Sequence, residues 1–268
     1  MTVVRTSNVD LKVNGDGAYA YVAQPDDNAK HPGLVLIQEW WGIEPHIRDL
    51  AQKLAAEGFV VAVPDLYHGK IATEPDDAEK MCMMISGNID KAAREIIGAL
   101  ETVKAMPNVA PKKLGLMGFC VGGLMTYVVA SRYHDLAAVV PFYGGGYDPK
   151  PEDIAKVNAP VLAFYGRRDQ GIPQEQVHKI ERMYKAAGKD FTVKVYDAGH
   201  AFINPDHGMG NEKAAAEAWP LAVPANSTRL PYRPPSRPHC AAAERPQAQR
   251  PDSSLACRGP FPPPSAYT

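Results

Sequence analysis

Along residues 10–219, short apolar runs alternate with longer segments in which apolar residues recur every three or four positions. The short runs are typical of buried strands, and the longer spacing is typical of amphipathic helices. The predicted strands are 10–13, 18–23, 34–37, 59–63, 114–117, 137–143, 160–165 and 191–196. The predicted helices are 44–56, 90–104, 124–132, 173–187 and 212–219, and Pro220 is expected to end the last one. Residues 66–77 are expected to form a polar, turn-rich connection.

This alternation predicts an α/β fold with a mostly parallel, doubly wound sheet. The first two strands are separated by Asn14-Gly15-Asp16-Gly17, which can supply the positive φ of a tight turn, so an N-terminal antiparallel hairpin is expected. Ligands of doubly wound sheets bind at the carboxyl ends of the strands. The loops of interest are therefore 39–42, 120–122, 144–146, 169–173 and 200–206.

The composition changes abruptly near the end of the chain. Of the 25 prolines, 12 lie in residues 220–268, together with six arginines and no lysine. This segment has neither helical nor strand periodicity and cannot assemble an apolar face. We therefore predict a single folded domain at 1–219, followed by an irregular or disordered Pro/Arg-rich tail at 220–268.

The balance of charged residues and the spacing of the cysteines argue against several classes of protein. Lys plus Arg total 29 and Asp plus Glu 30, which suggests no nucleic-acid or membrane partner. No apolar run approaches the roughly 18 residues of a membrane span. The four cysteines lack C-x-x-C spacing, and no metal-ligand or phosphate-loop motif occurs, so no metal or cofactor is expected. These features predict a soluble cytoplasmic protein, monomeric or weakly dimeric, that acts on a small molecule.

A cysteine stands between glycines directly after the predicted strand 114–117. Gly118 and Gly122 each lie two residues from Cys120, which gives the G-x-nucleophile-x-G elbow with a thiol in place of the usual serine hydroxyl. The glycines permit a sharp turn, and the start of the following helix favours a thiolate. The alternative is a structural cysteine in an ordinary turn, because free cysteine is among the most buried residue types.

Two further loops begin with residues suited to nucleophilic catalysis. Asp169 and His200 follow predicted strands, and the chain order Cys120, Asp169, His200 is that of α/β-hydrolases. Taken alone, Asp169 could be a turn residue before Pro173, and His200 could be an ordinary loop histidine. Three such residues in this order, at the carboxyl ends of strands, favour a catalytic triad.

Four stretches of the sequence resemble one known family. Residues 1 to about 219 resemble the dienelactone hydrolases, the cysteine-dependent carboxymethylenebutenolidases of the α/β-hydrolase fold. The matching stretches are Gln38-Glu39-Trp40-Trp41-Gly42, Gly118-Phe119-Cys120-Val121-Gly122-Gly123, Gly166-Arg167-Arg168-Asp169 with Ile172-Pro173, and Ala198-Gly199-His200-Ala201-Phe202. The resemblance implies cleavage of an ester or lactone through a thioester acyl-enzyme. Cys120 is then the nucleophile, His200 the general base, and Asp169 the residue that orients His200.

The resemblance also implies that Glu39 sits beside the thiol, controls its ionisation and is displaced by substrate. Independently, a carboxylate between an apolar strand and two tryptophans is costly without a partner, which favours a place in the site over an exposed rim position. The backbone N–H groups of Trp40 and Val121 are placed to form an oxyanion hole.

Aromatic residues near these loops could line an apolar pocket, although core packing is an equal alternative for Phe119 and Phe202. The predicted substrate-binding residues are Trp41, Tyr143, Phe202 and Asn204. Characterised dienelactone hydrolases bind the substrate carboxylate with an arginine four residues after the catalytic histidine, where this chain has Asn204. The substrate is therefore expected to differ from dienelactone. The alternatives are a general carboxylesterase or thioesterase with the same triad, and a catalytically silent binding protein of the same fold.

Overall fold

The computed structural model describes residues 2–13 and 17–225, and the strands within them form one eight-stranded sheet. The strand order is β1-β2-β4-β3-β5-β6-β7-β8, with β1 and β2 antiparallel to their neighbours and all later pairs parallel. The predicted mostly parallel α/β sheet is confirmed. The strands are β1 (Val4–Asp10), β2 (Tyr19–Pro25), β3 (Gly33–Ile37), β4 (Val60–Pro64), β5 (Leu114–Phe119), β6 (Leu136–Phe142), β7 (Val161–Gly166) and β8 (Phe191–Tyr196).

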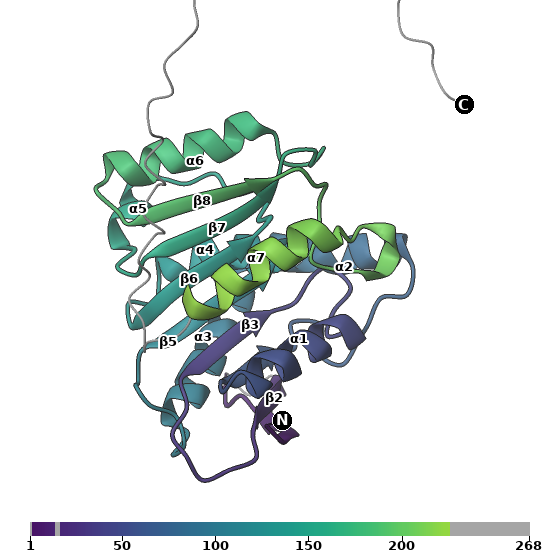
Figure 1. Ribbon diagram of the computed structural model, residues 1–268, viewed down its shortest axis with the longest axis vertical. Coiled ribbons are helices and arrows are strands. Elements are labelled where there is room, and N and C mark those ends of the chain that lie inside the picture. The colour runs from purple at the N-terminus through teal and green to yellow at the C-terminus, as the bar shows by residue number, and fades with distance from the viewer. Residues whose placement is uncertain (1, 14–16, 226–268) are drawn as a thin grey trace, which may run out of the picture. The chain divides into compact units, whose positions relative to one another are not determined.

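Helices cover both faces of the sheet (Figure 1). In that view α1 and α7 lie in front of the sheet, and α3 and α4 lie behind it. Every residue of the central strands β3, β4 and β5 is buried, as the continuous apolar runs predict. The helices are α1 (Pro45–Ala56), α2 (Pro75–Gly87), α3 (Ile89–Ala105), α4 (Val121–Ala130), α5 (Pro151–Lys156), α6 (Gln174–Ala186) and α7 (Glu212–Ala225), with a 3-10 turn η1 (Asp206–Gly208).

The N-terminal hairpin is confirmed, but its first strand lies earlier than predicted. β1 pairs with β2 from Val4 opposite Pro25 to Asp10 opposite Tyr19, whereas the predicted strand was 10–13. β1 is an edge strand whose side chains are mostly exposed, so it carries no apolar run that would mark it. Of the predicted turn, residues 14–16 lie outside the described part of the chain.

The prediction that Pro220 ends the last helix is wrong. Helix α7 continues through Pro220 to Ala225. Proline in a helix interior removes one backbone hydrogen bond, but tertiary packing can outweigh this local cost. Ala214, Ala218 and Ala222 recur at four-residue spacing and are buried, so one apolar face holds both halves of the helix against the core. The rest of the predicted tail, residues 226–268, lies outside the described residues.

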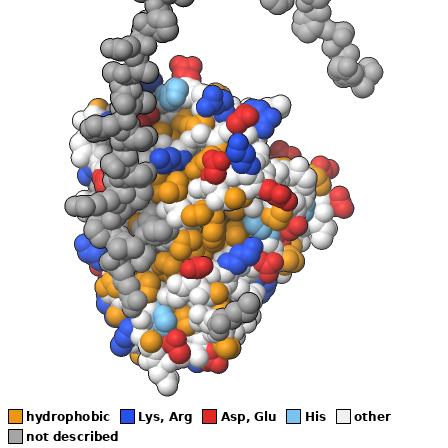
Figure 2. Space-filling model, in the orientation of Figure 1, with side chains coloured by type: hydrophobic (Ala, Val, Ile, Leu, Met, Phe, Trp, Pro, Cys, Tyr) orange, Lys and Arg blue, Asp and Glu red, His pale blue; other side chains and the backbone are white. Residues whose placement is uncertain are grey.

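A second difference concerns the predicted connection at 66–77. Helix α2 already begins at Pro75, which takes the first helical position. It contacts α3 and α4 and carries the methionine-rich segment 81–84. None of the helices in the described residues is long and apolar enough to cross a membrane. On the face that carries α1 and α7, apolar side chains gather beside α7, and charged side chains lie mainly around them (Figure 2).

Candidate active site

The elbow between β5 and α4 has the geometry that the glycine spacing predicts. Cys120 occupies the turn with φ 55° and ψ −116°, a conformation that is strained for a residue with a side chain. A Cβ atom on Gly118 would lie 2.3 Å from the carbonyl oxygen of Gly122. A Cβ atom on Gly122 would lie 2.4 Å from the carbonyl oxygen of Gln38. Both positions therefore require glycine, and the elbow is packed directly against the end of β3.

Replacing Gly122 by alanine should lower the free energy of unfolding by about 3 kcal/mol, because the new methyl group must displace backbone rather than a flexible side chain. Chemical denaturation followed by circular dichroism measures this. Gly87→Ala in α2 is the matched control, since a Cβ atom there meets nothing within 4 Å. Equal denaturation midpoints for the two variants would show that the elbow is not tightly packed.

Asp169 and His200 are joined by a short hydrogen bond. His200 Nδ1 lies 2.7 Å from Asp169 Oδ2, and Asp169 is buried. The other carboxylate oxygen, Oδ1, accepts the backbone N–H groups of Gly171 at 2.9 Å and Ile172 at 3.1 Å. An ionised carboxylate can only accept hydrogen bonds, so the Nδ1 atom of His200 carries the proton that is donated to Asp169. The other ring nitrogen, Nε2, can then interact with a different group. Asp169 therefore fixes both the orientation and the tautomer of His200.

The surroundings of His200 raise the pKa of its imidazole above the ordinary value. Burial opposes the charged imidazole, but hydrogen bonds to Asp169 and Cys120, together with their charges, outweigh it and raise the pKa of His200 from 6.5 to about 10. Cys120 is therefore close enough to His200 to affect the pKa of the imidazole. Of the three residues that sequence order singles out, Asp169 and His200 are in direct hydrogen-bond contact.

Glu39 is fully buried at the end of β3. Its Oε1 accepts the hydroxyl of Tyr143 at 2.9 Å, and its Oε2 accepts the side-chain amide of Asn204 at 2.7 Å. Burial raises the pKa of Glu39, and these two hydrogen bonds oppose that rise. The rim-exposed alternative for Glu39 is therefore excluded. Its hydrogen-bond partners are the predicted substrate-binding residues Tyr143 and Asn204.

The side-chain amide of Asn204 donates hydrogen bonds to two carboxylates. Besides Glu39, its Nδ2 donates to Glu44 Oε1 at 3.2 Å. The second oxygen of Glu44 lies 2.9 Å from His207 Nε2, and the His207 ring stacks on Trp41 with centroids 4.0 Å apart. Glu44 and His207 were not predicted, because their partners are some 160 residues away in the chain and no local motif marks them.

The strand register brings the loop after β3 to the elbow. β3 and β5 are adjacent, with Ile37 opposite Gly118, so the residues that follow each strand lie at the same edge. The predicted oxyanion-hole residues Trp40 and Val121 are in these two segments. Val121 is the first residue of α4, where a backbone N–H has no partner within its own helix.

Tyr67, in the loop after β4, was missed by the sequence analysis. It is 6% exposed, and its hydroxyl is buried without a hydrogen-bond partner among the described residues. Burial, followed by the charges of Cys82 and Cys120, raises the pKa of Tyr67, so its hydroxyl stays protonated. The only sequence signal is its position after a buried strand, at the edge of the sheet that carries the site.

The comparisons with known proteins agree with this geometry. Residues 18–224 match the model of the dienelactone hydrolase family. The chain belongs to that family. A protein from Aquifex aeolicus named "Putative carboxymethylenebutenolidase" is 34% identical over 80% of this chain and 95% of its own length. "Protein usf" from Aquifex pyrophilus is also 34% identical, over the same shares. The expected resemblance is thus confirmed, and the chain is a hydrolase of the dienelactone hydrolase type.

Solved structures give the same fold. The crystal structure of a "Putative Dienelactone Hydrolase" from Klebsiella pneumoniae superimposes with a TM-score of 0.75 at 25% identity, covering 84% of this chain and 99% of that one. A dienelactone hydrolase-like promiscuous phosphotriesterase from metagenomic libraries, at 22% identity, also gives a TM-score of 0.75, over 83% and 96% of the two chains. The α/β-hydrolase fold of this family member is therefore confirmed.

The aromatic residues of this dienelactone hydrolase family member divide into two groups. Phe119 and Phe202 have no exposed surface; Phe119 stacks on Phe142, and Phe202 packs edge-on against Tyr143. Core packing, the alternative for both, fits these contacts. Trp40 is half-buried and packs edge-on against Trp41. Within the described residues, no three His, Cys, Asp or Glu side chains are grouped closely enough to hold a metal ion.

Proposed function

We propose that this family member hydrolyses a carboxylic ester or lactone through Cys120, His200 and Asp169, with a thioester acyl-enzyme as intermediate. The observation that carries the proposal is the 2.7 Å hydrogen bond between His200 and Asp169, with Cys120 close enough to raise the pKa of the same imidazole. A thiol at a strained elbow, partnered by an oriented imidazole, matches the requirements of an activated nucleophile.

In the first half of the reaction, the Cys120 thiolate attacks the substrate carbonyl carbon and forms a C–S bond as the carbonyl electron pair moves onto oxygen. The N–H groups of Trp40 and Val121 donate to this oxyanion. When the electron pair returns, the C–O bond breaks and His200 Nε2 gives its proton to the leaving oxygen. The high pKa of His200 favours the imidazolium that this step consumes.

In the second half, a water molecule attacks the thioester carbonyl and passes a proton to His200 Nε2. The C–S bond then breaks, the acid leaves, and the thiolate–imidazolium pair is restored. Asp169 keeps its charge throughout and stabilises the imidazolium. Atoms and protons balance over the cycle, because one water is consumed and an alcohol or enol and an acid are released.

The substrate is proposed to be uncharged near the scissile bond. Asn204 supplies no positive charge, and its side-chain N–H groups already donate to Glu39 and Glu44, so they are not free to bind a substrate carboxylate. This favours a neutral ester or lactone over a dienelactone acid. It is also the observation that favours the second candidate function, a general carboxylesterase with the same triad.

The test compares a dienelactone with its uncharged methyl ester. We expect the purified protein to turn over the methyl ester at least as fast as the acid, because Asn204 offers no positive charge to compensate the acid for losing its hydration. The measurement is kcat/KM for both compounds at neutral pH. Strong preference for the acid would contradict the neutral-substrate proposal. Hydrolysis of simple aryl esters, with neither lactone accepted, would favour the general carboxylesterase.

A second prediction concerns Tyr67. Tyr67→Phe should lower kcat/KM about tenfold, because the buried hydroxyl of Tyr67 has no protein partner among the described residues and is proposed to donate to the substrate. The same change should leave the free energy of unfolding unchanged or raised, since that hydroxyl has no partner in the described structure. Tyr133→Phe, at the far end of α4, serves as the control. Unaltered activity in Tyr67→Phe would remove this hydroxyl from the site.

A further inference from the structure

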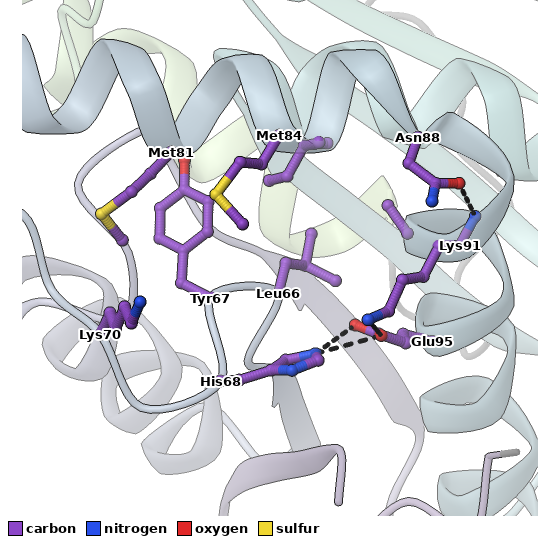
Figure 3. Close-up of a pocket in the computed structure, with 11 residues that line it drawn as sticks. Leu66, Tyr67, His68, Lys70, Met81, Met84, Asn88, Lys91 and Glu95 are labelled. Atoms are coloured by element: carbon purple, nitrogen blue, oxygen red, sulfur yellow. Dashed lines mark hydrogen bonds and ion pairs between the residues drawn. The ribbon is translucent and has the colours of Figure 1, made fainter. Parts of the chain in front are cut away.

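A cavity lies next to Tyr67, in the part of the chain that follows β4. It has a volume of about 220 Å³ and is enclosed by the loop after β4, by α2 and by the first turns of α3 (Figure 3). We call it the His68 pocket. Cys120, Asp169, His200 and Glu39 are not among its lining residues, and Tyr67 contributes its ring to one wall. Nothing in the hydrolytic reaction accounts for the charged groups that this pocket contains.

One end of the His68 pocket is polar. His68 Nε2 lies 3.1 and 3.2 Å from the two carboxylate oxygens of Glu95, which is 3% exposed. Lys91 Nζ approaches the same carboxylate at 3.9 Å, an ion-pair distance. Figure 3 shows His68, Lys91 and Glu95 gathered at this end, with Asn88 above Lys91. One buried carboxylate thus contacts both a lysine and a histidine, and the whole lining has two lysines, Lys70 and Lys91, against one acidic residue, Glu95.

The other end is apolar and adaptable. Met81, Met84 and the Tyr67 ring lie together there, and Leu66 lines the floor between the two ends (Figure 3). Met84 is 69% exposed, an unusual position for a large apolar side chain at the mouth of a pocket. Unbranched methionine side chains adjust their shape to a hydrocarbon surface. Lys70 adds a further positive charge on this side.

From this arrangement we propose that the His68 pocket binds a small monocarboxylate with a hydrocarbon body. The carboxylate lies beside His68 and accepts a charge-assisted hydrogen bond from the ammonium of Lys91, which also pairs with Glu95, and the hydrocarbon lies between Met81 and Met84. The volume equals roughly seven water molecules at about 30 Å³ each, which limits the ligand to a short chain or a single ring. The excess of positive side chains excludes an organic cation. This site does not depend on the proposed hydrolytic function.

The test titrates hexanoate into full-length protein that carries ¹³C-methyl methionine. We expect saturable shifts of the Met81 and Met84 methyl signals, assigned by Met81→Leu and Met84→Leu. Hexanamide, which has the same shape without the charge, should bind at least tenfold more weakly. Lys91→Gln should weaken hexanoate binding about tenfold, the effect of losing one charge-assisted contact. Lys80→Gln, on α2 outside the pocket, should leave it unchanged.

His68→Asn provides a second variant, because His68 has φ 52° and asparagine tolerates that conformation. It should also weaken hexanoate binding. The proposal is overturned if hexanoate fails to shift the two methyl signals, or if hexanamide binds equally well. It is also overturned if Lys91→Gln and His68→Asn both bind like the wild type. Binding that is lost in Cys120→Ala but kept in these two variants would place hexanoate at the hydrolytic site instead and would equally refute the pocket.

Discussion

Cys120→Ala should abolish ester hydrolysis, lowering kcat/KM by about 10⁴-fold or more, since removing one member of a triad removes the covalent route entirely. Cys82, the other free cysteine of the described residues, lies on α2 rather than at the elbow. The measurement is the initial rate of hydrolysis of the ester or lactone that the wild type accepts, with circular dichroism to establish that the variant is folded.

Cys82→Ala is the matched control, because it removes a thiol of similar burial and should leave the rate within a few-fold of wild type. Mass spectrometry after rapid mixing with a slow ester should show an acyl adduct on the peptide that contains Cys120. Residual activity of Cys120→Ala near the wild-type level would refute the thioester mechanism while leaving family membership intact. Full retention of activity with an adduct on Cys82 would move the nucleophile to α2.

The triad that we propose could be inferred from the sequence because its members lie in a fixed relation to the sheet. Cys120, Asp169 and His200 each follow a parallel strand, and parallel strands end at the same edge. Residue type and chain order were therefore enough to propose that these three side chains meet. The need for glycine at the elbow could also be predicted from the spacing of Gly118 and Gly122 around Cys120. In the structure, the neighbouring backbone leaves no room for a side chain at either position.

The partners of Glu39 could not be predicted, because they depend on how distant loops pack. A buried carboxylate was expected to need a partner, and the structure supplies Tyr143 and Asn204. Sequence spacing does not reveal that the Asn204 amide also reaches Glu44, or that Tyr67 has a buried hydroxyl without a partner among the described residues. These contacts join segments that are neighbours only after the sheet has formed.

Helix α7 shows that tertiary packing can override a helix-ending residue in the sequence. Pro220 predicts a helix end, yet the helix continues because buried alanines on either side of it share one face. β1 was misplaced for a related reason, since an exposed edge strand has no apolar run to mark it. Local sequence rules thus predict the backbone well at the elbow, where steric contacts between neighbouring residues determine the conformation. They predict it poorly where packing against distant segments determines where an element begins or ends.

The second large effect is expected for Asp169→Asn, which should lower kcat roughly 10⁴-fold, as the same change does in serine triads. An amide at this position offers a donor as well as an acceptor, so His200 can adopt the wrong tautomer. The hydrogen bond and charge of Asp169 both raise the pKa of His200, so their loss should bring that pKa down from about 10. NMR titration of the His200 ring signals measures this shift directly.

The pH dependence of stability gives an independent readout with a definite sign. Because the pKa of His200 is raised from 6.5 to about 10 on folding, its contribution to stability is fully present below pH 6.5 and is lost as the pH rises through about 10. Asp169→Asn should flatten this dependence. Asp197→Asn, an exposed acid three residues before His200, should leave both the pH profile and kcat unchanged. If Asp169→Asn lowers kcat without lowering the pKa of His200, Asp169 supports the fold of the loop rather than the charge of the imidazole.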